Sequence, residues 1–102
     1  MGGPPIVTAY LAYAHAAAGD RANALLELDA LHEASPGGEA APFNLAIVYV
    51  GLGDHDRALE ELERARDAGS TLLAWLGQDA IFDPLRGDPR FVALLRELGF
   101  PE

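Results

Sequence analysis

Apolar residues recur at spacings of three and four along most of the chain, which is the period of an amphipathic helix. Leu25, Leu28 and Leu31 carry this pattern in one segment, and Leu59 and Leu62 carry it in another. Glycine and proline interrupt the pattern at intervals and mark the places where helices end or begin. No segment alternates apolar and polar residues as a half-buried strand does. The sequence therefore predicts an all-α protein.

The interruptions predict six helices and one isolated helical turn. The helices are expected at residues 5–18, 21–34, 39–52, 55–68, 71–78 and 89–98. Pro42 falls in the first turn of the third helix, where its missing N–H breaks no hydrogen bond. Asp83-Pro84 and Asp88-Pro89 each combine a capping aspartate with a proline at the first helical position. We expect the first pair to open the isolated turn and the second pair to open the last helix.

The chain contains an internal repeat. The segment Pro42–Asp54 matches Thr8–Asp20 at an offset of 34 residues, and residues 6–36 and 40–70 share nine identities in 31 positions. The identical pairs are Leu11/Leu45, Ala12/Ala46, Gly19/Gly53, Asp20/Asp54, Ala24/Ala58, Leu25/Leu59, Glu27/Glu61, Leu28/Leu62 and Ala34/Ala68. In each copy the glycine stops one helix and the aspartate caps the next. A self-match at this period is typical of helix–turn–helix repeat arrays.

The third predicted helix has almost no polar face, and Asn44 is the exception. Its apolar residues are Phe43, Leu45, Ala46, Ile47, Val48, Tyr49, Val50 and Leu52. A helix that is apolar on all sides is expected to be buried on all sides.

The charge of the chain narrows the choice of partners. The 102 residues carry 16 acidic and 7 basic side chains, a net charge of −9, and every basic residue is arginine. This balance repels phosphate backbones and anionic membranes, so we expect neither nucleic acid nor a membrane as a partner. An apolar or basic partner is electrostatically acceptable. There is no segment long enough to span a membrane and no signal-peptide pattern, so we expect a cytoplasmic location.

Few residues suggest chemistry. The chain has no cysteine, and the three histidines, His15, His32 and His55, do not have a metal-binding spacing. Asp54-His55-Asp56 fits a solvated helix cap better than a metal site, and the acidic residues of 60–63 fit a solvated helix face. We therefore expect no enzymatic activity, no metal and no cofactor.

The repeat resembles the tetratricopeptide repeat, whose consensus has a Leu-small pair, an aromatic residue, a Gly-Asp turn, two alanines and a proline in this order. Leu45-Ala46, Tyr49 and Gly53-Asp54 match it in the second copy, and Pro36 matches the closing proline of the first. The resemblance implies a right-handed stack of antiparallel helix pairs, an α-solenoid. It implies two full repeats at about 5–38 and 39–70, then a degenerate third unit with a capping helix at about 71–102. The ending is similar to the tails of bacterial tetratricopeptide regulators, which implies a bacterial source.

The same resemblance implies a non-catalytic protein-interaction module, because the first helix of each pair in such arrays lines a concave groove. The implied groove residues are Tyr13, Ala16, Ala17, Phe43, Asn44, Ile47, Val50 and Trp75. The clamp that some family members use for acidic tails needs lysine and arginine in the groove, and only Asn44 could belong to one here. The groove could hold a partner peptide or a second copy, or be covered by the segment Ile81–Leu85 or by the last helix. Alternative functions are homodimerisation and a regulatory fragment of a larger bacterial multidomain regulator.

Overall fold

The computed structural model describes residues 5–33, 41–69 and 80–99. These residues form five α-helices and one 3-10 helix, and none of them is in a strand, so the predicted all-α class is confirmed. The elements are α1 (Pro5–Ala17), α2 (Arg21–Glu33), α3 (Pro42–Leu52), α4 (His55–Asp67), η3 (Ala80–Leu85) and α5 (Pro89–Glu97). The helix expected at 71–78 lies outside the described residues.

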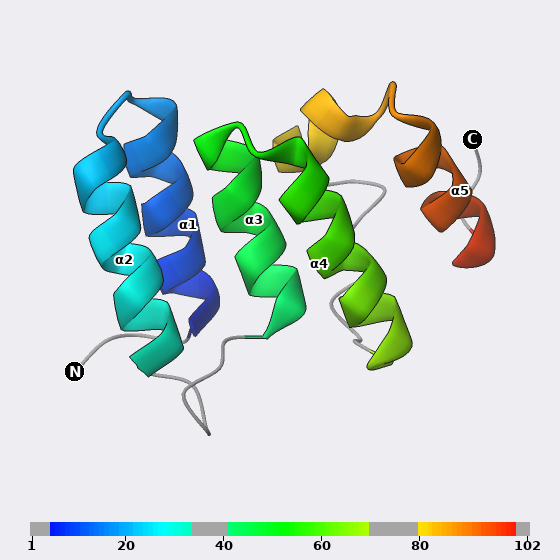
Figure 1. Cartoon of the computed structure of the whole chain (residues 1–102), viewed down its shortest axis with the longest axis horizontal. Coiled ribbons are helices and arrows are strands. Elements are labelled where there is room, and N and C mark those ends of the chain that lie inside the picture. Colours follow the sequence, from blue (N-terminus) through cyan, green and yellow to red (C-terminus); the bar gives the residue numbers. More distant parts are fainter. Residues whose placement is uncertain (1–4, 34–40, 70–79, 100–102) are drawn as a thin grey trace.

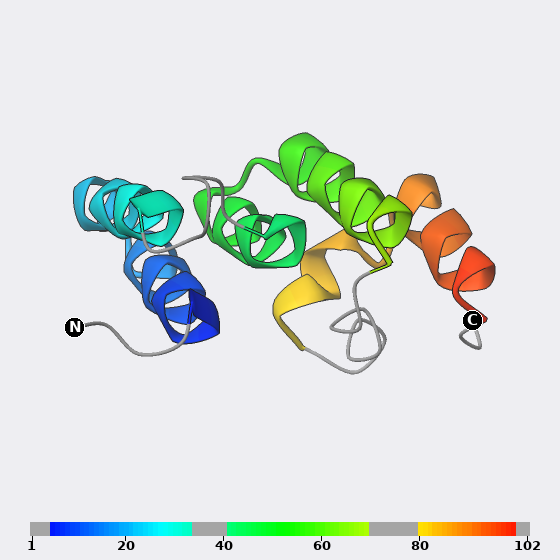
Figure 2. The same ribbon diagram turned by 90° about the horizontal axis from the view of Figure 1, so that it is seen from below.

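The helices form two antiparallel hairpins that stand side by side. Figure 1 shows α1 and α2 at one end of the molecule, α3 and α4 in the middle, and α5 at the other end. Helix α3 packs against α1, α2, α4 and η3, so it is the centre of the stack. Figure 2 shows that α1 and η3 lie on the same side of α3. We call this side, bounded by α1, α3 and η3, the concave face.

The two hairpins have the same turn. Gly19 and Gly53 adopt φ angles of +85° and +80°, a left-handed conformation in which glycine has no Cβ to clash. The backbone N–H of the next residue, Asp20 or Asp54, donates to the carbonyl five residues back, at 2.8 Å after α1 and at 3.0 Å after α3. Each aspartate side chain then accepts the N–H three residues on, at 3.3 Å. The predicted stop-and-start role of the Gly-Asp pairs is therefore confirmed.

The start of the third helix differs from the prediction. Helix α3 begins at Pro42, and Ala41 has the extended φ and ψ angles of −60° and 137°. A proline clashes with a helical conformation at the residue before it, so a helix that includes residue 41 is disfavoured. The expected start at residue 39 is wrong for this reason.

The isolated turn also differs from the prediction. It is the 3-10 helix η3, which begins at Ala80, before the Asp83-Pro84 pair that was expected to open it. Pro84 lies inside η3, and the N–H of Arg86 donates to the carbonyl of Asp83 at 3.1 Å. Asp88, by contrast, caps α5 as predicted, because its side chain accepts from the N–H of Arg90 at 2.8 Å.

The core is centred on α3, where every residue from Phe43 to Val48 is buried. This confirms the prediction for an all-apolar helix. Helix α3 approaches α1 closely at Gly51, where an added Cβ would lie 3.0 Å from the Cα of Tyr13. A residue larger than glycine at this position would push the two helices apart.

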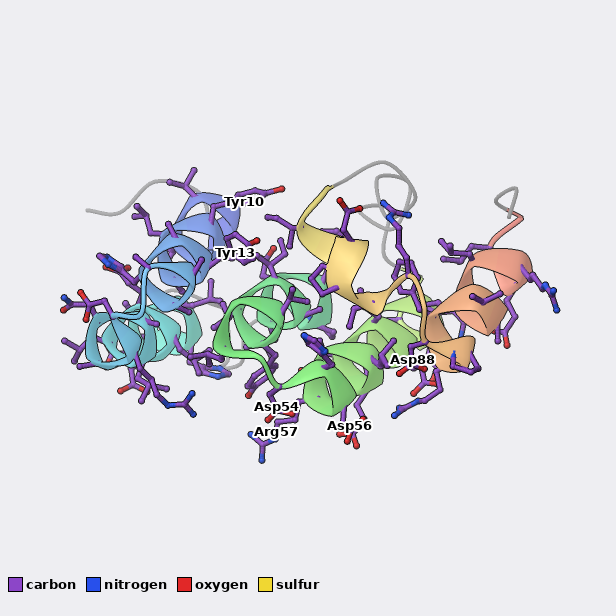
Figure 3. The ribbon with its side chains drawn as sticks, turned by 90° about the horizontal axis from the view of Figure 1, so that it is seen from above. Tyr10, Tyr13, Asp54, Asp56, Arg57 and Asp88 are labelled. Atoms are coloured by element: carbon purple, nitrogen blue, oxygen red, sulfur yellow. The ribbon has the colours of Figure 1, made fainter. Side chains whose placement is uncertain are left out.

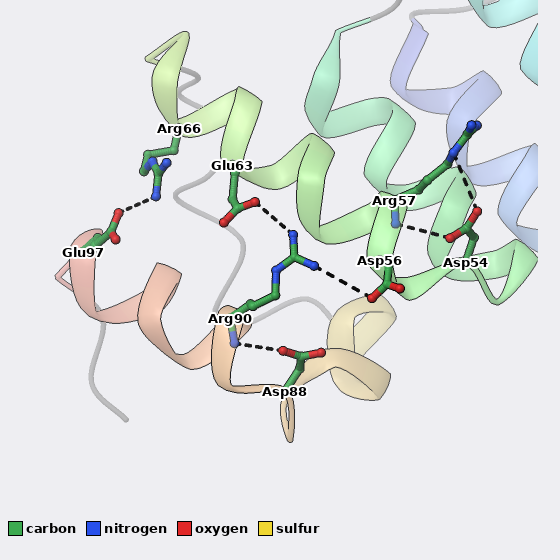
Figure 4. A network of polar contacts seen from close by, with 8 residues as sticks. All are labelled: Asp54, Asp56, Arg57, Glu63, Arg66, Asp88, Arg90 and Glu97. Carbon is green, nitrogen blue, oxygen red and sulfur yellow. Dashed lines mark hydrogen bonds and ion pairs between the residues drawn. The ribbon is translucent and has the colours of Figure 1, made fainter.

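The C-terminal elements close one end of the stack. The ring of Phe82 in η3 lies edge-on to the ring of Phe43, with 5.6 Å between the ring centroids. It also stacks with the ring of Phe91 of α5, with 6.4 Å between the centroids. Ion pairs join α5 to α4, with Arg66 to Glu97 at 2.5 Å and Arg90 to Glu63 at 3.1 Å (Figure 4). The outer side of α4 is therefore covered by the chain itself.

Candidate functional site

The predicted groove residues do not form one open surface. Phe43, Asn44, Ile47 and Val50 are buried, Tyr13 and Ala16 are half-buried, Ala17 is exposed, and Trp75 lies outside the described residues. The ring of Phe43 lies against Phe82, so at this position the chain covers its own groove. The covering residue belongs to the segment Ile81–Leu85, which was one of the expected occupants. The apolar pattern did not indicate which residue of this segment makes the contact, because the contact joins two distant parts of the chain.

Asn44 is the polar residue of this buried set. It is 5% exposed, and among the described residues no donor lies within hydrogen-bonding distance of its buried Oδ1. Asn44 precedes Gly51 by two helical turns, so both residues lie on the face of α3 that meets α1 at Tyr13. A buried carbonyl without a donor is uncommon, because it loses its hydrogen bonds to water and gains none in return.

Two tyrosines of α1 stand beside this position. Figure 3 shows Tyr10 and Tyr13 on the side of α1 that is directed toward α3 and η3. Tyr13 is half-buried against Gly51, whereas Tyr10 is 40% exposed. Tyr10 was not among the predicted groove residues, although its spacing of three from Tyr13 places both on one side of a helix. The exposed part of the concave face is therefore aromatic on the α1 side.

The opposite, convex side has a cleft of about 270 Å³ between the two hairpins. It is lined by His32, Leu45, Tyr49, Arg57, Glu60, Glu61 and Arg64. The buried carboxylate of Glu61 pairs with Arg64 at 2.7 Å. Arg57 lies over the ring of Tyr49, 5.5 Å from its centroid, and donates to its hydroxyl at 3.4 Å. This hydrogen bond raises the pKa of Arg57 above its usual value. The charges of Arg57, Glu61 and Arg64 thus interact with residues of the same chain.

The described residues offer little for catalysis. They contain no group of three or more His, Cys, Asp or Glu side chains that could hold a metal ion. In this part of the chain the hydrogen bond to Asn23 lowers the pKa of Asp20. Side-chain hydrogen bonds raise the pKa values of Arg57, Arg66 and Arg90. No helix among these residues is long and apolar enough to cross a membrane.

Repeated antiparallel hairpins with a shared Gly-Asp turn define an all-α helical-repeat protein. Residues 15–75 match the sequence model of the tetratricopeptide repeat, which is more than half of the chain. The chain belongs to the tetratricopeptide repeat family. Repeats of this family generally mediate protein–protein interactions and are typically non-catalytic. No curated protein and no solved structure is significantly similar to the chain.

Proposed function

We propose that the chain is a non-catalytic interaction module that binds a segment of a partner protein on its concave face. Its membership of the tetratricopeptide repeat family supports this class of function. The module consists of two repeats, at about 5–38 and 39–70, and of a degenerate third unit with a capping helix at about 71–102.

The observation that carries the proposal is the unpaired Oδ1 of Asn44. A buried acceptor gains most from a donor that arrives with a ligand, because it has no bond to water to give up. A polypeptide segment supplies such donors at regular intervals through its backbone N–H groups. The apolar surroundings of Asn44 favour a segment with apolar side chains, and the net charge of −9 favours a neutral or basic one.

The binding surface includes the predicted groove residues that remain accessible, and Tyr10 is added to them. Tyr10, Tyr13 and Ala17 form its α1 side, and Asn44 is its polar contact on α3. Phe43 and Ile47 support the floor from below, because they are buried. Since Oδ1 of Asn44 is shielded, side chains at the rim must move when the partner's donor reaches it.

The test is a selection of peptides from a displayed library against the whole chain, with calorimetry on the peptide that binds most tightly. Asn44→Leu keeps the branched shape but removes the acceptor, and we expect it to weaken binding by roughly tenfold, the effect of one hydrogen bond. Tyr10→Ala is expected to weaken binding by at least as much. Tyr49→Phe is the matched control, because Tyr49 lines the convex cleft on the other side of α3.

Two results would contradict the proposal. One is a selection that yields no binding peptide. The other is a peptide whose affinity is unchanged by Asn44→Leu and Tyr10→Ala, since its site would then lie elsewhere on the chain.

A further inference from the structure

The exposed large apolar side chains of the described residues are concentrated on the first hairpin. They are Val7, Tyr10, Leu11, Leu25 and Leu26, and all of them belong to α1 or α2. Tyr10 belongs to the concave face. Val7 and Leu11 share a neighbouring side of α1 with Ala14, and with Ala18 just after the helix, at spacings of three and four residues. All four are exposed, and Tyr10 lies at the border between this side and the concave face. We call this side of the first hairpin the end face.

The internal repeat allows the end face to be compared with the equivalent surface of the second hairpin. Leu11 and Leu45 are equivalent residues 34 positions apart, yet Leu11 is 48% exposed and Leu45 is 5% exposed. Ala14 is exposed, whereas its equivalent Val48 is 0% exposed. Leu45 lines the cleft that the second hairpin shares with α2, so the preceding hairpin provides its cover. The end face is therefore an apolar surface of the same kind as the interface between the hairpins, and no helix of the described residues covers it.

The charges of α1 indicate which kind of partner fits the end face. Helix α1 contains no Asp, Glu, Lys or Arg, and His15 is its one titratable group apart from the tyrosines. A basic partner would find no carboxylate on α1, and an acidic partner would find no cation. A neutral, apolar helix is complementary to it. Helix α1 of a second copy is neutral and apolar in this way. Contact through α1 also keeps the negatively charged surfaces of the two copies apart, which a net charge of −9 per chain would otherwise make repel each other.

The other end of the stack cannot receive the end face of a second copy. There α5 covers the outer side of α4, and the pairs Arg66–Glu97 and Arg90–Glu63 hold it in place (Figure 4). A head-to-tail arrangement, in which copies add without limit, is blocked. The remaining arrangement is closed, with the same surface used on both copies.

We propose that the end face is a homodimer interface, in which α1 of one copy packs against α1 of a second copy around a two-fold axis. The small side chains of Ala14 and Ala18 allow the two helices to approach closely, and Val7 and Leu11 supply the apolar area. This surface adjoins the concave face at Tyr10 but does not include Asn44, so Asn44→Leu separates the dimer from the proposed partner binding.

The test is the mass of the whole chain in solution, measured by light scattering and sedimentation over a dilution series. We expect the wild-type chain to approach twice its 10.8 kDa mass as the concentration rises. Leu11→Glu places a charge on the interface and is expected to weaken the dimer by at least ~100-fold, and its helical circular dichroism should be unchanged because Leu11 is half-exposed.

The matched control is Leu26→Glu. Leu26 is 64% exposed, and it lies two residues after the buried Ala24, so it is directed away from α1. We expect this variant to remain dimeric. A wild-type chain that is monomeric at all concentrations would overturn the proposal. A dimer that survives Leu11→Glu but not Leu26→Glu or Asn44→Leu would also overturn it, because the interface would then be another surface.

A second measurement uses the absence of cysteine from the chain. A single Ala14→Cys substitution near the two-fold axis should give a disulfide-linked dimer on mild oxidation, whereas Leu26→Cys should cross-link far more slowly. Equal rates for the two variants would contradict the assigned interface, even if the chain is a dimer.

Discussion

The substitution Asn44→Leu is expected to stabilise the isolated chain while it weakens partner binding. The side chain of Asn44 is 5% exposed, and its Oδ1 has no donor among the described residues. An unsatisfied buried polar group reduces stability by about 1–3 kcal/mol. Leucine has the same branching but larger terminal groups, and the extra volume gives back part of that gain. We therefore expect a net increase of about 1 kcal/mol in the free energy of unfolding, or roughly 4–8 °C in Tm for a domain of this size.

The assay is urea denaturation followed by circular dichroism, with two companion variants. Asn44→Asp retains the shape but buries a charge, and we expect it to lower stability by several kcal/mol at neutral pH and to recover as the carboxylate is protonated at acidic pH. Asn23→Leu is the same chemical change at an exposed asparagine whose amide donates to Asp20 at 2.6 Å, so it should cause no gain. A clear loss of stability for Asn44→Leu would refute the reasoning, because the unpaired Oδ1 would then not be the dominant cost at this position.

Three further substitutions test the packing, each by the free energy of unfolding from denaturant titration. Gly51→Ala is expected to lose about 1–3 kcal/mol although alanine favours helices, because its Cβ would lie 3.0 Å from the backbone of Tyr13; a gain would contradict the close approach of α1 and α3. Phe82→Ala should lose about 3–5 kcal/mol, since this fully buried ring covers Phe43; a loss below ~1 kcal/mol would mean that η3 is not part of the core. Gly53→Ala should lose about 1–2 kcal/mol, because its φ of +80° is left-handed, and an unchanged midpoint would argue against the turn.

Most of the helical framework could be predicted from the sequence, because its determinants are local. Helices α1, α4 and α5 begin at the predicted residues and end one residue earlier than expected. The Gly-Asp pairs fix both hairpin turns through contacts within five residues. The later start of α3 at Pro42 also has a local cause, because a proline disfavours the helical conformation of the residue before it.

The candidate site could be predicted only in part, because burial depends on neighbours that local patterns do not specify. The run of apolar residues between Pro42 and Gly53 placed Phe43 and Asn44 on one helix. It did not show that Phe82 would cover Phe43 or that the Oδ1 of Asn44 would remain without a donor among the described residues. The family resemblance implied that both residues line a groove. It did not indicate which of these residues the segment Ala80–Leu85 covers.

The same sequence motif is exposed in the first hairpin and buried in the second, because the two hairpins have different neighbours in the stack. Leu11 and Leu45 have the same residue type, the same helical position and the same Gly-Asp turn after them, and only the second has a preceding hairpin beside it. At the C-terminal end α5 covers the last hairpin. One side of α5 packs into the core, and its Arg90 and Glu97 form ion pairs with α4. At the N-terminal end of the described stack, the outer side of α1 is apolar and uncharged, unlike the polar outer face of a capping repeat. Of the two stack ends that the structure describes, only the N-terminal one therefore presents an apolar surface on which a closed dimer can form.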